Sequence, residues 1–192
     1  ITMESFKINL KAYYQLTKPG IVYGNAITAS AGFFLAAKGH VNPLLFRSML
    51  FGIGFVMASA CVFNNYIDRN IDKKMARTKK RCLVSGFIAT QNALLFGSVI
   101  GLIGLYLLAA HTNLLAASIA VFGFFAYVVL YGVAKRHTVH STIVGSISGA
   151  IPPVVGYCAV TNHIDIAAFL LFLILVCWQI PTFYALAIYR IY

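Results

Sequence analysis

The chain has 192 residues, of which 60% are hydrophobic and only 10% are charged. Soluble domains usually carry about 25% charged residues, so this composition excludes an ordinary water-soluble domain and indicates an integral membrane protein. The net charge of +11 is compatible either with nucleic-acid binding or with a signal for membrane topology.

Six apolar segments are long enough to cross a bilayer as helices, which takes about 20 residues. In chain order they span residues 21–37, 44–67, 89–110, 114–134, 142–160 and 166–188. Short connections follow the first, third and fifth segments, so neighbouring helices should run antiparallel. We expect kinks in the last two segments, at Pro152-Pro153 and at Pro181. The sequence therefore predicts an all-α, polytopic transmembrane helix bundle, with a single domain over residues 1–192.

The cations are divided very unevenly between the two ends of this bundle. Thirteen of the fifteen Lys and Arg residues fall at one end, and seven of them lie between Arg69 and Arg81. Only Lys38 and Arg47 fall at the other end. Because loops rich in Lys and Arg remain in the cytoplasm, we expect the N-terminus, the basic loop and Tyr192 on the cytoplasmic side. Membrane insertion alone requires this bias, so we do not expect nucleic acid as a partner.

Membrane topology depends on Lys and Arg, so it does not explain why two of the four acidic residues lie at the end of an apolar segment. Asp68 and Asp72 follow the second apolar segment at a spacing of four, and Asn64 lies four residues earlier. If the helix continues, the three side chains share one face and form a ladder of oxygen donors roughly 12 Å long. Mg²⁺ takes few protein oxygens and completes its shell with substrate phosphates, so the ladder would suit Mg²⁺ bridging a diphosphate. Four cations that follow could neutralise the remaining phosphate charge: Arg77, Lys79, Lys80 and Arg81.

Two other interpretations of the acidic pair remain open at this point. Asp68 and Asp72 could pair with Arg69, Lys73 or Lys74 as a solvated helix end. They could also handle cations in a transporter or pore, although such sites favour broken helices near the midplane of the membrane. The spacing alone does not decide between a metal site, a solvated helix end and a transport site.

Four stretches give the sequence a resemblance to a known family. They are TKPGIVYGN at 17–25, CVFNNYIDRNIDKKMARTKKR at 61–81, KRHTVHSTIVGSISGAIPPVVGY at 135–157 and WQIP at 178–181. In this order, and over essentially the whole chain, they resemble the haem O synthases, or protoheme IX farnesyltransferases, of the intramembrane prenyltransferase superfamily. The Asn-x-x-x-Asp-x-x-x-Asp element marks the superfamily, and the other three stretches point to the haem branch.

The resemblance implies a reaction and a cofactor. Such enzymes transfer the farnesyl group of farnesyl diphosphate to a vinyl group of haem b with addition of water, giving haem O and diphosphate. Asn64, Asp68 and Asp72 match the motif that binds Mg²⁺ and diphosphate, so they are the expected metal ligands and catalytic residues. Arg77 and Arg81 match the basic residues that follow this motif.

Other polar residues are candidates for contacts with the substrates. Arg136 or His137 could serve haem as a propionate partner or an axial ligand, or could simply lie near lipid headgroups. Asn25 lies at the depth expected for Asn64, and it either lines the site or forms a hydrogen bond between helices. Gln179 could form a hydrogen bond with a substrate. The remaining candidates are Lys80 and Lys135.

The resemblance also implies a setting: a bacterial inner membrane, an active site on the cytoplasmic side, and a haem A synthase or terminal oxidase as recipient of the product. Family members have nine spans and a second Asp-rich motif after the sixth, so we expect a truncated chain. Two alternatives are an inactive remnant and an aromatic-acid prenyltransferase of quinone biosynthesis. Thr182 stands where the haem branch has His. Gly145 and Gly149 offer either close helix packing or room for a flat macrocycle.

Overall fold

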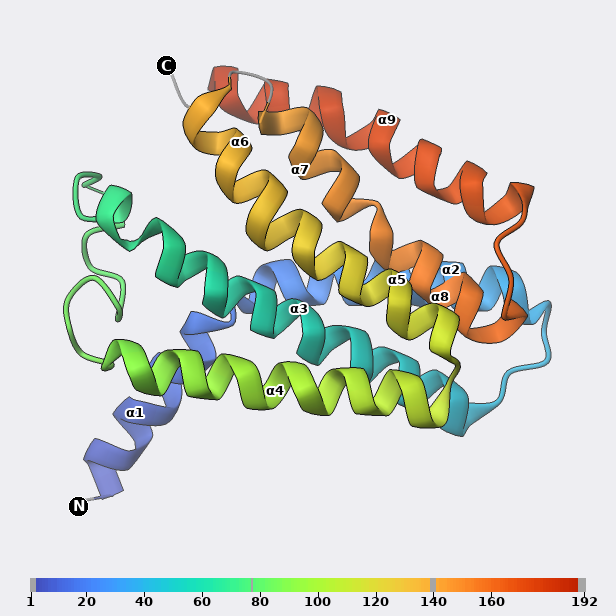
Figure 1. Cartoon of the computed structure of the whole chain (residues 1–192), viewed down its shortest axis with the longest axis horizontal. Helices are drawn as coiled ribbons and strands as arrows, with labels where there is room; N and C mark the ends of the chain where they lie inside the picture. The colour runs from blue at the N-terminus through green and yellow to red at the C-terminus, as the bar shows by residue number, and fades with distance from the viewer. Residues whose placement is uncertain (1–2, 77, 139–140, 190–192) are drawn as a thin grey trace.

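The computed structural model describes residues 3–76, 78–138 and 141–189, and within these ranges all the regular elements are helical (Figure 1). Six segments are long and apolar enough to cross a membrane, which confirms the predicted bundle. Their bounds are Pro19–Ala37, Pro43–Asp72, Thr90–His111, Leu114–Arg136, Ser141–Thr161 and Ile166–Ala185. The helices α1 (Met3–Leu16), α2 (Pro19–Ala37), α3 (Pro43–Asp72) and α4 (Thr90–His111) account for the first three spans and the segment before them.

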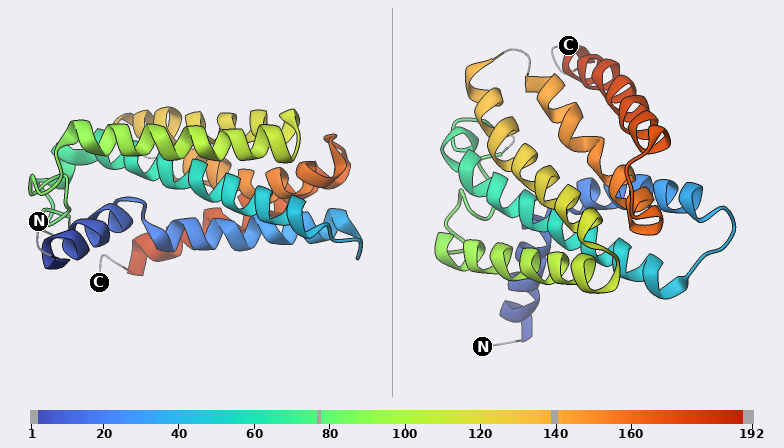
Figure 2. Two further views of the ribbon diagram at one scale, coloured as in Figure 1. Left: turned by 90° about the horizontal axis from the view of Figure 1, so that it is seen from below. Right: turned by 45° about the vertical axis from the view of Figure 1, so that its right-hand side comes forward.

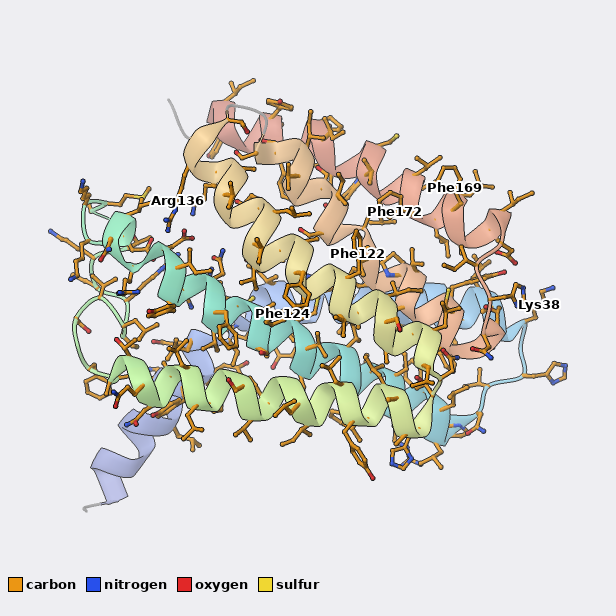
Figure 3. All side chains as sticks on the ribbon, viewed as in Figure 1. Lys38, Phe122, Phe124, Arg136, Phe169 and Phe172 are labelled. Atoms are coloured by element: carbon orange, nitrogen blue, oxygen red, sulfur yellow. The ribbon has the colours of Figure 1, made fainter. Side chains whose placement is uncertain are left out.

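The helices lie side by side, and α1 projects away from one end of the bundle (Figures 1 and 2). We call this the basic end, because it holds Lys18, the segment 69–81, Lys135 and Arg136. The opposite end holds the connections 38–42, 112–113 and 162–165. Figure 3 labels Arg136 at the basic end and Lys38 at the opposite end.

Helix α3 is the longest element, with 30 residues, and it packs closely along α4. Small residues allow the two backbones to approach, since a Cβ atom on Gly104 would lie 2.7 Å from the carbonyl oxygen of Gly52. At the opposite end, the side chain of Asn42 accepts hydrogen bonds from the amides of Leu44 and Leu45 and so caps the start of the helix. The packing against α4 and the cap at Asn42 fix the direction of α3. This helix carries the face formed by Asn64, Asp68 and Asp72.

The fourth span contains an irregularity that the sequence did not predict. A π-helical segment, η1 (Ala126–Leu130), lies between α5 (Leu114–Phe125) and α6 (Tyr131–His137). The wider π turn places Tyr127 and Tyr131 nearly above one another, with ring centroids 5.7 Å apart and ring planes 14° apart. Single π turns occur often at functional sites, so this tyrosine pair is a candidate functional position.

The fifth span is divided into α7 (Ser141–Gly149) and α8 (Ile151–Thr161). The break falls at Ala150, directly before Pro152-Pro153, because proline cannot donate the next helical hydrogen bonds. This confirms the predicted kink. Pro181, in contrast, lies inside α9 (Ile166–Tyr189), which continues past it without a break.

The α8 half of this span is closely packed against α2. A Cβ atom on Gly156 would overlap the carbonyl oxygen of Ala29, and one on Gly32 would overlap the carbonyl oxygen of Pro153. The α7 half instead meets side chains: a Cβ atom on Gly145 would lie 3.2 Å from the ring of Tyr131. The two halves of one span therefore pack very differently.

Candidate functional site

The three side chains of the ladder lie where the helical spacing predicts. Helix α3 continues to Asp72, so Asn64, Asp68 and Asp72 share one face at the basic end. All three are buried, with exposed fractions of 2%, 1% and 3%. Carboxylates are rarely buried to this extent without partners, because removing a charge from water is costly. The burial contradicts the interpretation of a solvated helix end.

The three polar side chains of the ladder, which we call its rungs, each accept a hydrogen bond from a different cation. Lys18 donates to Asn64 Oδ1 at 3.0 Å, Lys135 to Asp68 Oδ2 at 2.8 Å, and Arg81 to Asp72 Oδ2 at 2.6 Å. The cations come from the α1–α2 connection, from α6, and from the loop after α3. The contacts of Lys18 and Lys135 are distant in sequence, whereas Arg81 lies nine residues after Asp72.

The cations adjacent to the carboxylates in sequence do not pair with them. The guanidinium of Arg69 lies 4.2 Å from the centre of the Tyr66 ring and donates to the carbonyl oxygen of Tyr66. Lys73 and Lys74 are exposed. The helix-end pairing that the sequence left open is therefore not the arrangement in the structure.

Further hydrogen bonds hold the surrounding chain against α3. The hydroxyl of Thr78 donates to the carbonyl oxygen of Asp72 at 3.0 Å, and Arg136 donates to the carbonyl oxygen of Ile67 at 2.6 Å. Asn65 donates through Nδ2 to the carbonyl oxygen of Leu16 at 2.9 Å. These bonds fix the basic loop, α6 and the α1–α2 connection, which are the elements that carry the three cations.

The site carries a net positive charge, and it contains buried polar atoms that have no hydrogen-bond partner among the described residues. Two carboxylates face three cations, so the ladder and its partners carry a net charge of about +1, which favours an anionic ligand. Asp68 Oδ1 is buried and has no hydrogen-bond partner, so it is available to a metal ion. Within the described ranges, no three residues among His, Cys, Asp and Glu form a metal cluster. Mg²⁺ takes few protein oxygens and keeps water and phosphate oxygens for the rest of its shell, so the oxygens of Asn64, Asp68 and Asp72 fit this ion.

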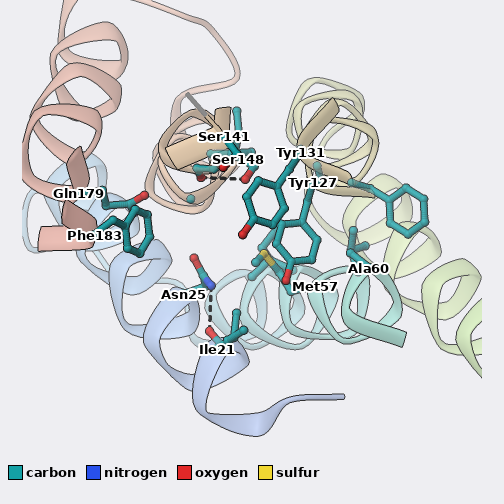
Figure 4. Close-up of a pocket in the computed structure, with 18 of the residues that line it drawn as sticks. Ile21, Asn25, Met57, Ala60, Tyr127, Tyr131, Ser141, Ser148, Gln179 and Phe183 are labelled. Carbon is teal, nitrogen blue, oxygen red and sulfur yellow. Dashed lines mark hydrogen bonds between the residues drawn. The ribbon is translucent and has the colours of Figure 1, made fainter. Parts of the chain in front are cut away.

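An apolar cavity of about 400 Å³ lies within the bundle (Figure 4). Ala60 lines it one helical turn before Asn64, and Tyr131 lines it one turn before Lys135, so ladder and cavity share the same helix faces. Most of the surrounding side chains are apolar or aromatic. Residues that line the cavity and are labelled in Figure 4 include Ile21, Asn25, Met57, Ala60, Tyr127, Tyr131, Ser141, Ser148, Gln179 and Phe183.

Two polar candidates from the sequence lie in the wall of this cavity. Asn25 projects from α2 and donates to the carbonyl oxygen of Ile21 at 2.8 Å. Gln179 projects from α9, and its Oε1 atom is buried without a hydrogen-bond partner. A Cβ atom on Gly149 would collide with Gln179, so this glycine gives room to the glutamine at the same time as it brings α7 close to α9.

The remaining sequence candidates have different outcomes. Lys80 is exposed, and Arg136 binds a backbone carbonyl rather than a rung of the ladder. Arg77 and the side chain of His137 lie outside the described residues. Thr182 donates its hydroxyl to the carbonyl oxygen of Trp178 at 2.7 Å, so that hydroxyl is committed to its own helix.

Lys18 is the residue of the site that the sequence prediction missed. It was treated there only as part of the charge bias, although it stands directly before Pro19 at the start of a span. Burial lowers the pKa of its ammonium group, and the nearby cations Arg81 and Lys135 lower it further, whereas Asp68 raises it. A basic residue between an interfacial helix and a buried span was the signal that could have identified it.

Comparison with known proteins places this geometry in a family. The sequence profile of the UbiA prenyltransferase family matches residues 25–192. The protoheme IX farnesyltransferase of Serratia proteamaculans (strain 568) is 52% identical over 182 residues, covering 94% of this chain and 62% of that protein. The protoheme IX farnesyltransferase of Pseudomonas savastanoi pv. phaseolicola (strain 1448A / Race 6) is 50% identical over 184 residues, covering 95% and 62%. The chain thus spans about 62% of the length of these curated relatives.

Two solved structures share the fold at low sequence identity. A structure of a digeranylgeranylglyceryl phosphate synthase in membranes has a TM-score of 0.76 at 23% identity, covering 89% of this chain and 60% of that chain. A UbiA homologue from Archaeoglobus fulgidus, bound to DMAPP and Mg²⁺, has a TM-score of 0.72 at 18% identity, covering 88% and 62%. Because the family profile covers most of its length, the chain belongs to the UbiA prenyltransferase family.

Proposed function

We propose that this protein transfers the farnesyl group of farnesyl diphosphate to a vinyl group of haem b, with addition of water, giving haem O and diphosphate. The observation that carries the proposal is the buried ladder of Asn64, Asp68 and Asp72, with a cation on each rung, one helical turn along α3 from an apolar cavity. About 50% identity to protoheme IX farnesyltransferases over nearly the whole chain supports haem b as the acceptor.

The ladder would hold Mg²⁺ through the carboxylates of Asp68 and Asp72 and the amide oxygen of Asn64. When bound, Mg²⁺ supplies positive charge that stabilises a departing diphosphate. Asp68 is suited to this role because one of its oxygens has no hydrogen-bond partner among the described residues. The Archaeoglobus relative, whose structure contains DMAPP and Mg²⁺, supports the same chemistry here.

The cations of the chain would neutralise the rest of the charge on the leaving group. As the bond between the allylic carbon and the diphosphate oxygen breaks, negative charge accumulates on the diphosphate. Lys135 and Arg81 already lie on the carboxylates of the ladder, so they would need little rearrangement to bind this charge. Preorganised cations of this kind lower the barrier to ionisation.

The cavity would then direct the allylic carbon to its acceptor. Its apolar walls exclude most water, which limits premature hydrolysis of the farnesyl group. The vinyl group of haem b forms the new carbon–carbon bond, one water molecule adds its oxygen to the neighbouring carbon, and a proton is released. Asn25 and Gln179 are polar groups in an apolar wall, so they are suited to orient the acceptor.

The proposal includes a location and recipients. The charge bias favours a bacterial inner membrane with the N-terminus and the basic end in the cytoplasm, where a water-soluble diphosphate would leave. The lipid bilayer would supply the farnesyl diphosphate, and a haem A synthase or a terminal oxidase would receive haem O. We also propose that residues 1–192 act as one domain.

The decisive experiment is chromatography of the haems formed by the protein in nanodiscs supplied with farnesyl diphosphate, haem b and Mg²⁺. We expect a new haem with the retention and mass of haem O, which disappears when Mg²⁺ is chelated. Absence of this product, with prenylation of an aromatic acid in a parallel reaction, would favour the quinone-type alternative. Absence of both products would leave an inactive remnant as the explanation.

A further inference from the structure

Lys18 joins the end of α1 to the start of α2 through a left-handed residue. Its dihedral angles are φ 51° and ψ 65°, in the region that side chains other than glycine seldom adopt. It stands immediately before Pro19, and it forms no side-chain cap on α2. It is also the second residue after Leu16, the last residue of α1, and left-handed residues commonly end helices at this position.

A second lysine provides a direct comparison, because Lys38 is also left-handed, with φ 46°. Lys38 follows the last residue of α2, where left-handed residues likewise end helices, and its side chain is exposed. The two lysines therefore share a backbone conformation that helix capping explains. They differ in their side chains, because that of Lys18 is half-buried and reaches Asn64.

The structure holds Lys18 in place from both sides. Its amide donates to the carbonyl oxygen of Gln15 at 3.1 Å, which continues the turn that ends α1. On the other side, the buried Asn65 donates to the carbonyl oxygen of Leu16 and ties this turn to α3, next to Asn64. The contact needs a donor at position 65, which the amide of Asn65 supplies and an ionised carboxylate would not.

The charges single out Lys18 among the three cations. Lys135 and Arg81 each lie on a carboxylate, so each of those pairs is close to neutral. Lys18 lies on Asn64, which is uncharged, and it donates there only one of the three N–H bonds of its ammonium group. A half-buried cation without a carboxylate on its own rung is suited to an anionic ligand.

We propose that Lys18 is a diphosphate-binding residue of this site, and that Asn65 is the residue that positions it. The proposal rests on the function proposed above, since it takes the diphosphate of the prenyl donor as the ligand. Without diphosphate, the ammonium group rests on Asn64. With diphosphate bound, its remaining N–H bonds serve the phosphate oxygens.

The test of Lys18 is a calorimetric titration of the protein in nanodiscs with inorganic pyrophosphate in the presence of Mg²⁺. We expect Lys18→Met to weaken binding about ten- to hundredfold, the range typical of a charge-assisted hydrogen bond, and Lys18→Arg to recover most of the affinity. Lys38→Met is the matched control and should bind like the wild type. Unchanged affinity in Lys18→Met would overturn the proposal.

The test of Asn65 is a double-mutant cycle with the same titration. Asn65→Leu removes the bond to Leu16 without adding charge, and Asn65→Ala serves the same purpose if the leucine variant does not fold. If Asn65 acts through Lys18, the single variant weakens pyrophosphate binding, and the double variant with Lys18→Met is no weaker than Lys18→Met alone. Additive losses would show that Asn65 supports the fold and does not position Lys18.

The outcomes separate this inference from the proposed function. Pyrophosphate binding needs no haem, so the titration can succeed even if no haem O is formed, and the acceptor would then be wrong while the role of Lys18 stands. Conversely, formation of haem O together with normal pyrophosphate binding by Lys18→Met would overturn only the present inference. A haem titration followed in the Soret band should be unchanged in Lys18→Met, which excludes general damage to the cavity.

Discussion

Acidic residues at the two ends of the bundle are stabilised in contrasting ways. At the opposite end, Asp165 accepts hydrogen bonds from the amide of Ala168 and the hydroxyl of Tyr157, and His163 lies 3.4 Å away. All three partners lie within eight residues of it in sequence, and the side chain remains 36% exposed. Asp165 therefore serves the local start of α9, as many helix caps do.

At the basic end, Asp72 pairs with Arg81, nine residues away, but Asp68 takes its partner from elsewhere in the fold. Asp68 pairs with Lys135, which is 67 residues away, and both Asp68 and Asp72 are almost completely buried. Burying charges costs more free energy than a local cap, and such pairs are weak contributors to stability. The difference agrees with a structural role for Asp165 and with the chemical role proposed for the ladder.

The largest effect should come from removing one carboxylate of the ladder. In Asp68→Asn, or equally Asp72→Asn, we expect haem O formation to fall about a hundredfold or more, because an anionic ligand of the proposed Mg²⁺ site is lost. Asp165→Asn tests the comparison between the two ends and should keep near-normal activity. The measurement is the rate of haem O formation by chromatography. Normal rates in Asp68→Asn and Asp72→Asn would remove metal binding from the mechanism.

The next effect concerns the two halves of the fifth span. In Gly156→Ala the new methyl group meets the backbone of Ala29, so we expect a loss of stability of about 1–3 kcal/mol or more and a lower melting temperature. In Gly149→Ala the new methyl group meets only the flexible side chain of Gln179, so stability should change less and the KM for haem should rise. Equal melting temperatures for the two variants would contradict this assignment.

A smaller effect is expected from the arginine on the last rung. Arg81→Ala should lower kcat/KM for farnesyl diphosphate about tenfold, because the guanidinium then no longer supports Asp72 or the phosphate. Arg47 at the opposite end donates only to the carbonyl oxygen of Pro43, so Arg47→Ala is the matched control. If steady-state kinetics do not distinguish the two variants, the basic loop serves topology alone.

The smallest effect is a dependence of stability on pH at the opposite end. The amide of Ala168 and then the hydroxyl of Tyr157 hold the pKa of Asp165 below its ordinary value. A lowered pKa in the folded state stabilises the protein above the unfolded pKa of about 4, and this contribution is lost as the pH falls through the folded value. The melting temperature of Asp165→Asn should therefore lie below that of the wild type near pH 7 and converge with it in acid. A gap that persists in acid would show that the charge of Asp165 is irrelevant.

The sequence was sufficient for the features that depend on local periodicity. Six apolar runs of sufficient length predict six spans, and a spacing of four places Asn64, Asp68 and Asp72 on one helix face. The break at Pro152-Pro153 was likewise predictable, because proline removes a helical donor. These inferences need no information about which helices are neighbours.

The remaining features depend on contacts between distant segments, which a single sequence does not reveal. The pairing of Lys135 with Asp68 requires α6 to lie beside α3, and the position of Lys18 depends on a bond from Asn65. The π turn at Ala126–Leu130 has no proline or glycine to announce it. Predicting the partners of the ladder from composition alone was therefore impossible, and the neighbouring Arg69 was the wrong choice.

The length of α3 has a consequence for how the reaction would be measured. Thirty residues extend about 45 Å, which exceeds a hydrocarbon core of about 30 Å, so the ladder at the end of this helix reaches headgroup depth. A prenyl diphosphate can then keep its tail among the acyl chains and its head in water while it diffuses laterally toward the site. Turnover should follow its mole fraction in the lipid phase, so adding inert phospholipid at constant bulk concentration would slow the reaction.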